Sequence, residues 1–401
     1  MPSSTHNSVV LGSNFAGLAI SHYILRHIIP SVASNTDKKC KLTIISPSTH
    51  YFFKVGAPRA ISQPELVDKV SMPFAVAFQD YGDLYAFVQG EAVALDPSMK
   101  LVTVKGVTDT DEDRIQIPYD SLIIATGTTS ASPLWTLHGP HTVTNNAICD
   151  TNADISKANT ILIAGGGPTG VETAGEIAYH WHGKDITLFS GSTRLLSNLS
   201  HKGVGTSAES HLRRLKVMTV HMTKVASTSK TAKGTTLVEL NNGTTREVDL
   251  YIDATGGTPN TSFLPAEWLD TRGSVITDPE TLRVTSAPAG VYAIGDVASY
   301  SKRNVLDVHR VVAPLGYSLW ADMTKKAKVK APLTKKLYKQ DPGDFQFVPI
   351  GPKGGVGTAF GWSVPSFMRW LAKSRTFFID KVPANVASAS YTNIDVSSLP
   401  S

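Results

Sequence analysis

Two glycine-rich turns, in different halves of the chain, constrain this sequence most. The first reads Gly-Ser-Asn-Phe-Ala-Gly over residues 12–17, and the second reads Gly-Gly-Gly-Pro-Thr-Gly over residues 165–170. Each follows a short apolar run and precedes a helix-like segment, which is the strand–turn–helix order of a dinucleotide-binding unit. The free N–H groups and positive dipole end of such a helix favour a pyrophosphate. The sequence therefore predicts two dinucleotide sites in one chain.

The second turn follows the usual pattern closely. Residues 160–164 predict a buried parallel strand, and Pro168 stands where a helix begins. Gly165 is expected to make the tight turn, Gly167 to let the backbone approach a pyrophosphate, and Gly170 to let helix and strand pack closely. The alternative is a turn that binds nothing, but the order of strand, turn, helix and strand favours nucleotide binding.

The first turn departs from this pattern at its second glycine. Asn14 stands there, and its side chain either occupies space that a pyrophosphate would use or donates its amide to the phosphate. The following helix is expected over residues 16–29, and Pro30 predicts its end. We interpret the turn as a dinucleotide site, with a relic loop as the alternative. Its predicted binding residues are Gly12, Ser13, Asn14, Phe15, Ala16 and Gly17.

Both units lack the acidic residue that usually ends the second strand and holds the ribose hydroxyls. Ser46 takes this place in the first unit and Ser190 in the second, with Arg194 four residues later. The missing carboxylate removes a repulsion against a 2′-phosphate. The second site therefore favours NADPH, or no preference between NADPH and NADH, unless Ser190 and Arg194 are ordinary surface residues.

The composition predicts a soluble globular protein of two or three domains. The chain has 401 residues, of which 41% are hydrophobic and 18% charged. No apolar run reaches the ~18 residues of a membrane-spanning helix. Residues 1–7 are too short for a signal peptide, and Pro2 stands where N-myristoylation needs glycine. We expect a cytoplasmic protein, or one peripheral to a mitochondrial or other membrane.

Cysteine and histidine usage restricts the chemistry. The two cysteines, Cys40 and Cys149, are far apart in the sequence, and no Cys-x-x-Cys motif occurs. A redox-active dithiol is therefore not expected, and electrons must enter and leave through a bound cofactor. The histidine pairs lack a third ligand at metal-site spacing, so no metal is expected.

One basic segment stands out against the net charge of +5. Residues 325–339 hold seven lysines and no acidic residue. This segment predicts either contact with an anionic membrane surface or a solvated linker, and the linker is favoured. Nucleic-acid binding has no support, because no recognisable module surrounds the lysines.

Repeated turns suggest a duplicated architecture. The segment 120–127 ends in Ala-Thr-Gly, with Gly127 closing the turn, and the segment 249–260 repeats this pattern. Asp296 follows a predicted strand at the carboxyl edge where ligands collect in open sheets, although a helix-capping aspartate is the alternative. We predict an α/β fold with two Rossmann-like dinucleotide-binding domains and a small C-terminal α+β domain.

The C-terminal segment differs in texture from the rest. Residues 349–361 form a glycine-rich, hairpin-like stretch, and residues 367–378 combine aromatic and basic side chains at near-helical spacing. The second stretch predicts core packing, which is favoured, or else membrane docking or a wall around an apolar acceptor.

The chain resembles flavoproteins with two dinucleotide-binding domains, in the pyridine nucleotide-disulfide oxidoreductase superfamily. Within them it is similar to the apoptosis-inducing-factor-like branch, and most to ferroptosis-suppressor-type NAD(P)H:quinone oxidoreductases and their fungal relatives. The resemblance covers nearly the whole chain. It is carried by residues 9–17, 48–59, 122–127, 163–177, 291–296 and 355–378.

The resemblance implies FAD in a discontinuous domain of residues 1–128 and 283–325, NAD(P)H in residues 129–282, and a C-terminal domain of residues 326–401. It also implies that a hydride passes from NAD(P)H to FAD and that electrons then pass to a quinone-like acceptor. The residues it assigns are Arg59 to the flavin, Val93 to the adenine side, Asp296 to the ribityl chain, Glu172 to the nicotinamide and flavin, and Lys353 to the quinone pocket.

Two other functions stay open on the same fold. One is a redox-gated flavoprotein that binds a partner or acts as a pro-death factor, with turnover incidental. The other is a tailoring oxidoreductase of secondary metabolism that acts on a soluble aromatic substrate.

Overall fold

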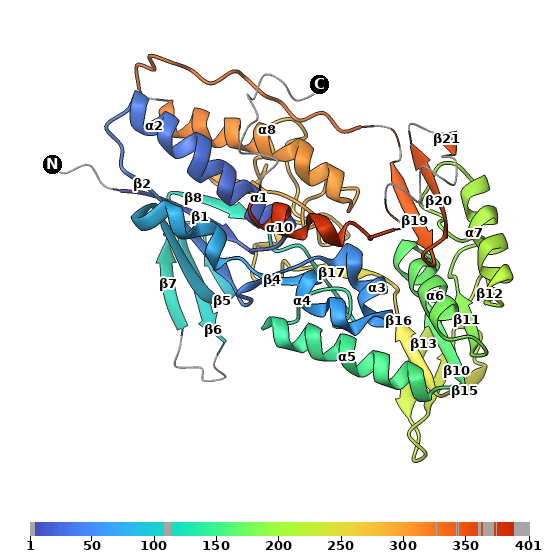
Figure 1. Cartoon of the computed structure of the whole chain (residues 1–401). Coiled ribbons are helices and arrows are strands. Elements are labelled where there is room, and N and C mark those ends of the chain that lie inside the picture. Colours follow the sequence, from blue (N-terminus) through green and yellow to red (C-terminus); the bar gives the residue numbers. More distant parts are fainter. Residues whose placement is uncertain are drawn as a thin grey trace.

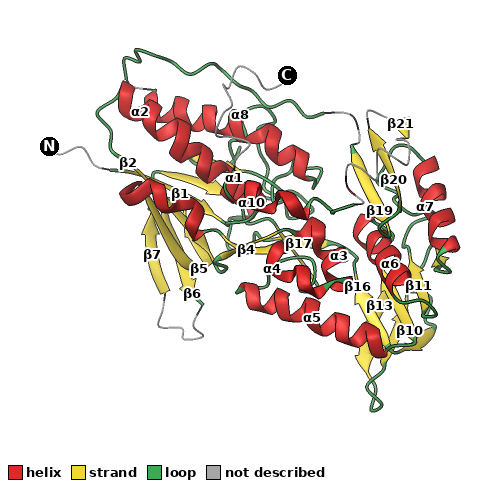
Figure 2. Cartoon of the chain, in the orientation of Figure 1, coloured by secondary structure: helices red, strands yellow, loops and turns green. Residues whose placement is uncertain are grey.

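Two separate sheets carry the two glycine-rich turns in the computed structural model of the chain (Figure 1). The structure describes residues 5–107, 114–325, 327–341, 343, 345–359, 362–363, 373 and 375–388. Helices cover both sheets, as Figure 2 shows, so the predicted α/β fold is confirmed. Within the described ranges, no helix is long and apolar enough to span a bilayer.

The first sheet has seven strands in the order β18-β8-β1-β2-β5-β6-β7. Their bounds are β1 (His6–Leu11), β2 (Cys40–Ser46), β5 (Tyr85–Asp96), β6 (Leu101–Gly106), β7 (Arg114–Pro118), β8 (Ser121–Ile124) and β18 (Val291–Ala293). The five strands from β18 to β5 are parallel, and β6 and β7 extend the edge in antiparallel pairing. Strand β18 thus returns to a sheet built from the first third of the chain. The predicted domain boundaries themselves stay a prediction.

A layer of helices packs on this sheet. It comprises α1 (Phe15–Tyr23), a π-helical turn η1 (Ile24–Ile28), α2 (Ile29–Asn35) and α8 (Val305–Thr324). Helices α1 and α8 approach closely at Gly316, where a Cβ would lie 2.3 Å from the Tyr23 ring. The prediction that Pro30 ends the first helix is wrong. The π-helical turn resets the hydrogen-bond register, so that Pro30 falls in the first turn of α2, where its missing N–H is not needed.

Between β2 and β5 the chain forms short elements that reach toward the second sheet. They are β3 (His50–Phe52), η2 (Lys54–Gly56), α3 (Ala57–Ser62), η3 (Pro64–Leu66), α4 (Val67–Val70), β4 (Ser71–Pro73) and η4 (Ala75–Leu84). Strands β3 and β4 pair in antiparallel fashion.

The second sheet has four parallel strands in the order β12-β11-β10-β16. Its strands are β10 (Thr160–Ala164), β11 (Asp185–Phe189), β12 (Met218–Val220) and β16 (Leu250–Asp253), and its helices are α5 (His141–Lys157), α6 (Pro168–His180) and α7 (Gly203–Arg214). A three-stranded antiparallel sheet follows, with β13 (Val225–Lys230), β14 (Thr236–Leu240) and β15 (Thr245–Val248), and η5 (Ala266–Trp268) lies further along the chain. Strand orders of this kind place ligands at the carboxyl ends of the strands.

Two short strands mark the crossings between the sheets. Strand β9 (Thr128–Ser130) leaves the first sheet, β17 (Gly257–Pro259) returns from the second, and the two pair in antiparallel fashion. Asn260 fixes this crossing, because its backbone N–H donates to Gly127 O at 3.0 Å and its side chain donates to Thr126 O at 2.9 Å. The crossings thus follow the two Ala-Thr-Gly turns of the sequence.

The C-terminal segment contacts both halves of the molecule (Figure 1). Its described elements are β19 (Gln346–Ile350), β20 (Gly354–Ala359), β21 (Trp362–Ser363), η7 (Ile379–Lys381) and α10 (Val382–Val386). The β19–β20 hairpin confirms the hairpin-like reading of this stretch. It packs against α6 at Gly175, where a Cβ would lie 2.8 Å from Ile350 Cα. Helix α10 packs on α1, and the His22 ring hydrogen-bonds Val386 O at 3.1 Å.

Two sequence interpretations concern segments around this region. Residues 327–339 of the lysine-rich stretch form no helix or strand and cross from α8 to the hairpin, which supports the linker reading (Figure 1). Most of the aromatic and basic stretch 367–378 lies outside the described residues. Its described Phe377 is fully buried, which supports core packing at that position.

Candidate functional site

A single cleft of about 1930 Å³ lies between the two sheets and is lined by both glycine-rich turns. The carboxyl ends of the central strands open into it from both sides, as expected for ligand sites in open α/β sheets. The predicted site residues that line it are Gly12, Ser13, Asn14, Phe15, Ala16, Gly127, Gly165, Gly167, Glu172, Ser190 and Asp296.

The first turn has the geometry of a phosphate-binding turn. Gly12 has φ +106°, and a Cβ there would lie 2.4 Å from Ala125 O, so the turn requires glycine. A Cβ at Gly17 would lie 1.9 Å from Gly12 O, which shows how closely α1 packs on β1. The side-chain oxygen of Asn14 is buried and has no hydrogen-bond partner among the described residues. The free N–H groups of this helix N-terminus fit a bound dinucleotide phosphate, whereas the Asn14 oxygen, which accepts hydrogen bonds, fits a hydroxyl donor of the dinucleotide.

The second turn repeats this geometry. Gly165 has φ +124°, and its Cβ would lie 2.2 Å from Ala254 O. A Cβ at Gly170 would lie 1.8 Å from Gly165 O, whereas one at Gly167 would meet nothing within 4 Å. The tight turn and the close packing expected of Gly165 and Gly170 are therefore present. Gly167 faces open space in the cleft, and its contact with a pyrophosphate stays a prediction.

Both strand-end serines are buried and hydrogen-bonded within the chain. Ser13 Oγ donates to Ser46 Oγ at 2.8 Å, and Ser190 Oγ donates to Arg194 O at 3.2 Å. The Arg194 guanidinium clamps its own loop by donating to three backbone carbonyls. These are Leu196 O at 3.3 Å, Ser197 O at 2.9 Å and Leu199 O at 2.6 Å. Arg194 does not line the cleft. The sequence predicts that Arg194 contacts the nucleotide, whereas in the structure its guanidinium contacts the backbone of its own loop.

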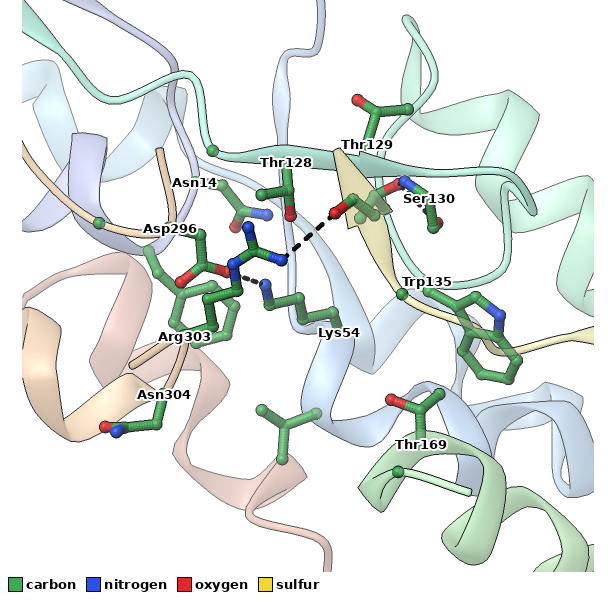
Figure 3. A pocket seen from close by; sticks show the side chains of 18 of the residues that line it. Asn14, Lys54, Thr128, Thr129, Ser130, Trp135, Thr169, Asp296, Arg303 and Asn304 are labelled. Carbon is green, nitrogen blue, oxygen red and sulfur yellow. Dashed lines mark hydrogen bonds and ion pairs between the residues drawn. The ribbon is translucent and has the colours of Figure 1, made fainter. Parts of the chain in front are cut away.

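Asp296 lies in the cleft, three residues after the end of strand β18. Its carboxylate pairs with Lys54 Nζ at 2.5 Å, and Asn14 lies nearby (Figure 3). Arg303 also lines the cleft and donates to Gly257 O at 3.3 Å, which ties the first unit to the returning strand β17 (Figure 3). Sequence reasoning missed Lys54, although it lies in the segment 48–59 that carried the family resemblance.

Glu172 and Lys373 form a buried ion pair in the wall of the cleft. Lys373 Nζ donates to Glu172 Oε1 at 2.6 Å and to Phe347 O at 3.1 Å. Burial raises the pKa of Glu172 to about 7, although the charge of Lys373 acts against this rise. The second turn places Glu172 here, because it lies in the first turns of α6.

Lys373 lines the cleft and Lys353 does not. Lys353 is exposed on the turn between β19 and β20. Val93 is half-buried at an irregularity of the β5–β6 pairing, and its neighbours Glu91 and Ala92 line the cleft instead.

Arg59 is also placed differently from its predicted flavin contact. Its side chain is buried and forms a two-pronged ion pair with Glu176 of α6, through Nε to Oε2 and through Nη2 to Oε1 at 3.1 Å. The guanidinium lies over the Phe377 ring at 4.6 Å. Arg59 does not line the cleft. Arg59 thus joins α3 of the first unit to α6 of the second. Its partner Glu176 lies one helical turn beyond Glu172.

Comparison with known proteins decides the family. The sequence pattern of the pyridine nucleotide-disulphide oxidoreductases matches residues 6–316. The chain is 32% identical to "Oxidoreductase phnG" of Penicillium herquei over 94% of both chains. The chain belongs to the pyridine nucleotide-disulphide oxidoreductase family. Members of this family use FAD and NAD(P)H, so the predicted cofactors and the oxidoreductase class are confirmed.

Other relatives agree with this family. The chain is 31% identical to "Oxidoreductase ptaL" of Pestalotiopsis fici, over 94% of this chain and 98% of the relative. It is 25% identical to human "Ferroptosis suppressor protein 1", over 92% and 93% of the two chains. The solved sulfide:quinone oxidoreductase of Aquifex aeolicus shares the fold, with a TM-score of 0.70, 15% identity and coverage of 95% and 92%. The family's name refers to a disulphide. In this chain both cysteines, Cys40 and Cys149, are free and lie outside the cleft lining.

Proposed function

We propose that this chain passes a hydride from NAD(P)H at the second glycine-rich turn to FAD at the first, and then passes two electrons to a quinone-like acceptor. The observation that carries the proposal is that both turns, Asp296 and the Glu172–Lys373 pair line one continuous cleft. The resemblance to ferroptosis-suppressor-type quinone oxidoreductases, and the full-length similarity to the human protein of that name, support the choice of acceptor.

The residues of the first turn fit FAD. The glycines leave room for its pyrophosphate. The side-chain oxygen of Asn14 has no partner within the described residues, and the carboxylate of Asp296 can accept a hydrogen bond from a ribityl hydroxyl. When bound, FAD accepts a hydride from the nicotinamide and passes electrons on in the second half-reaction. The protein's part is to hold both nucleotides in one cleft and to exclude competing reactions.

Glu172 and Lys373 handle protons in this scheme. Reduction of a quinone to a quinol takes two electrons and two protons, and the hydride brings both electrons but only one proton. The other proton comes from solvent. A carboxyl group with a pKa of about 7 holds a proton near neutral pH and can also release one, and Glu172 has this property inside the cleft. Lys373 keeps the carboxyl oriented through its 2.6 Å contact.

The proposal is tested by the visible spectrum of the purified protein. We expect a flavin spectrum that bleaches within seconds when NADPH or NADH is added without oxygen. The flavin absorbance should then recover when a short-chain quinone is added. A colourless protein that also fails to take up added FAD would remove the oxidoreductase claim. A flavin that bleaches but never passes electrons to any quinone would leave the first half-reaction and refute the acceptor.

Glu172→Gln is the matched variant for the proton role. It keeps the shape of the side chain and removes its charge and its exchangeable acid, while the second turn stays intact. We expect FAD binding to persist and quinone reduction to slow. Unchanged quinone reduction in this variant would show that Glu172 handles no proton.

A second candidate acceptor has support from one observation. The chain is more similar to two fungal proteins named oxidoreductases, at 32% and 31% identity, than to human ferroptosis suppressor protein 1, at 25%. A tailoring oxidoreductase that acts on a soluble aromatic substrate fits this pattern. Activity with short-chain quinones, but none with long-chain quinones in liposomes, would favour this candidate and count against a membrane acceptor.

A further inference from the structure

One lysine lies where the second site would hold the ribose of its nucleotide. Lys224, four residues after the end of β12, lines the cleft together with Ser190, Gly191 and Ser192, which follow β11. A Cβ at Gly191 would lie 2.9 Å from Cε and 3.0 Å from Cγ of Lys224. The lysine stem therefore lies across Gly191. In a Rossmann-like unit this strand end is where the adenosine ribose of a dinucleotide is held.

The charges around this position favour an anion. The acidic residues that line the described part of the cleft are Glu91, Glu172 and Asp296, and none of them follows β11 or β12. The structure shows no ion pair of Lys224 within its described residues. Arg194, four residues after Ser190, donates its guanidinium N–H groups to the backbone of its own loop.

The first unit has a charged residue of opposite sign near the corresponding strand end. Its strand-end Ser46 pairs with Gln89 of β5, and Glu91, two residues further along β5, lines the cleft. In the second unit, the end of β11 pairs with Val220 of β12, and Lys224 follows four residues later. Each unit thus has a serine where the ribose-binding acid is usual, and each has a charged side chain close by in the cleft lining, Glu91 on the neighbouring strand β5 and Lys224 in the loop after the neighbouring strand β12.

We propose that Lys224 binds the 2′-phosphate of NADPH and makes the second site selective for it, while Glu91 suits the first site to the unphosphorylated ribose of FAD. An ammonium group and a phosphate form a strong charge-assisted pair. A carboxylate at the same place would repel the phosphate and accept hydrogen bonds from ribose hydroxyls. The inference rests on the proposed function, because it takes the second turn as the nicotinamide nucleotide site.

The test compares two nucleotides on the FAD-loaded protein by calorimetry. Adenosine 2′,5′-bisphosphate carries the 2′-phosphate and AMP lacks it. We expect the wild type to bind the bisphosphate about tenfold more tightly or better. Lys224→Ala should remove this preference and Lys224→Glu should reverse it. The preference should also weaken as salt rises, because the pair is exposed to solvent.

Turnover gives a second readout of the same variants. The KM for NADPH should rise about tenfold in Lys224→Ala, with the KM for NADH and the kcat at saturation unchanged. Lys233→Ala is the matched control, because Lys233 is exposed on the turn between β13 and β14 and does not line the cleft. This control should keep the wild-type preference.

The outcomes separate this inference from the function on which it rests. Equal binding of both nucleotides by the wild type, or a preference that survives Lys224→Ala, would overturn the role of Lys224 while flavin bleaching by either donor left the function intact. If neither nucleotide binds and neither donor bleaches the flavin, the second turn is not a nucleotide site and both proposals fall.

Discussion

The buried pair of Arg59 and Glu176 makes a sharp test of how the two units are joined. The side chains are 6% and 0% exposed, so neither charge has water to replace its partner. Removing one partner of a buried pair leaves the other charge uncompensated, which costs about 3–5 kcal/mol. We therefore expect Arg59→Met to lower the free energy of unfolding by about this amount, with part of the loss from the Phe377 contact.

The double variant Arg59→Met with Glu176→Gln is the decisive control. It removes both charges, so we expect it to recover most of the loss, since replacing a whole buried pair by apolar or neutral groups is often close to neutral. Urea denaturation, followed by tryptophan fluorescence and by flavin release, measures both variants. Because Arg59 does not line the cleft, the double variant should keep its FAD content and its rate of flavin bleaching.

One result would refute this reasoning. If Arg59→Met loses FAD while the free energy of unfolding stays at the wild-type value, Arg59 contacts the flavin in the loaded protein and is no link between the units. Failure of the double variant to recover stability would show that the guanidinium contributes through packing rather than through its charge.

The remaining predictions concern Glu172 and the second turn. The folded protein holds a proton on Glu172 with a pKa of about 7, above its ordinary value of 4.5, so this group's contribution to stability is present below pH 4.5 and is lost as pH rises to about 7. Glu172→Gln should flatten that part of the pH–stability curve in urea titrations, and an unchanged curve would contradict the buried position. Gly170→Ala should destabilise the fold, because its Cβ would lie 1.8 Å from Gly165 O, whereas Gly167→Ala should leave the melting temperature unchanged and weaken NAD(P)H binding. Thermal melts and nucleotide titrations check both, and equal effects of the two alanines on stability would show that the turn does not need its glycines separately.

The fold and the two turns could be predicted from sequence because their signals are local. Gly165 and Gly170 lie within one strand–turn–helix unit, and the steric need for each glycine arises from neighbours a few residues away or from a strand of the same sheet. The positions of Asp296 and Glu172 in the cleft are predictable for a related reason, since Asp296 lies shortly after strand β18 and Glu172 lies in the first turns of α6, which begins at the cleft.

The contacts that the sequence could not indicate are those whose partner lies far along the chain. Arg59 pairs with a residue 117 positions away, and Lys373 reaches Glu172 across 201 positions. No local pattern indicates such partners, so the sequence does not distinguish the buried Lys373 from Lys353 on the hairpin turn. The prediction at Pro30 is wrong for another reason, because a π-helical turn precedes it and the helix continues beyond the proline.

The C-terminal segment has a consequence for how the protein matures. Its hairpin packs on α6 at Gly175, and α10 packs on α1 at His22, so each element needs one of the two units to be folded before it can dock. The ribosome synthesises these residues after those that form both surfaces. The segment therefore covers a surface on each unit. A chain that terminates before Gln346 would leave both surfaces exposed to solvent and be a ready substrate for chaperones and proteases.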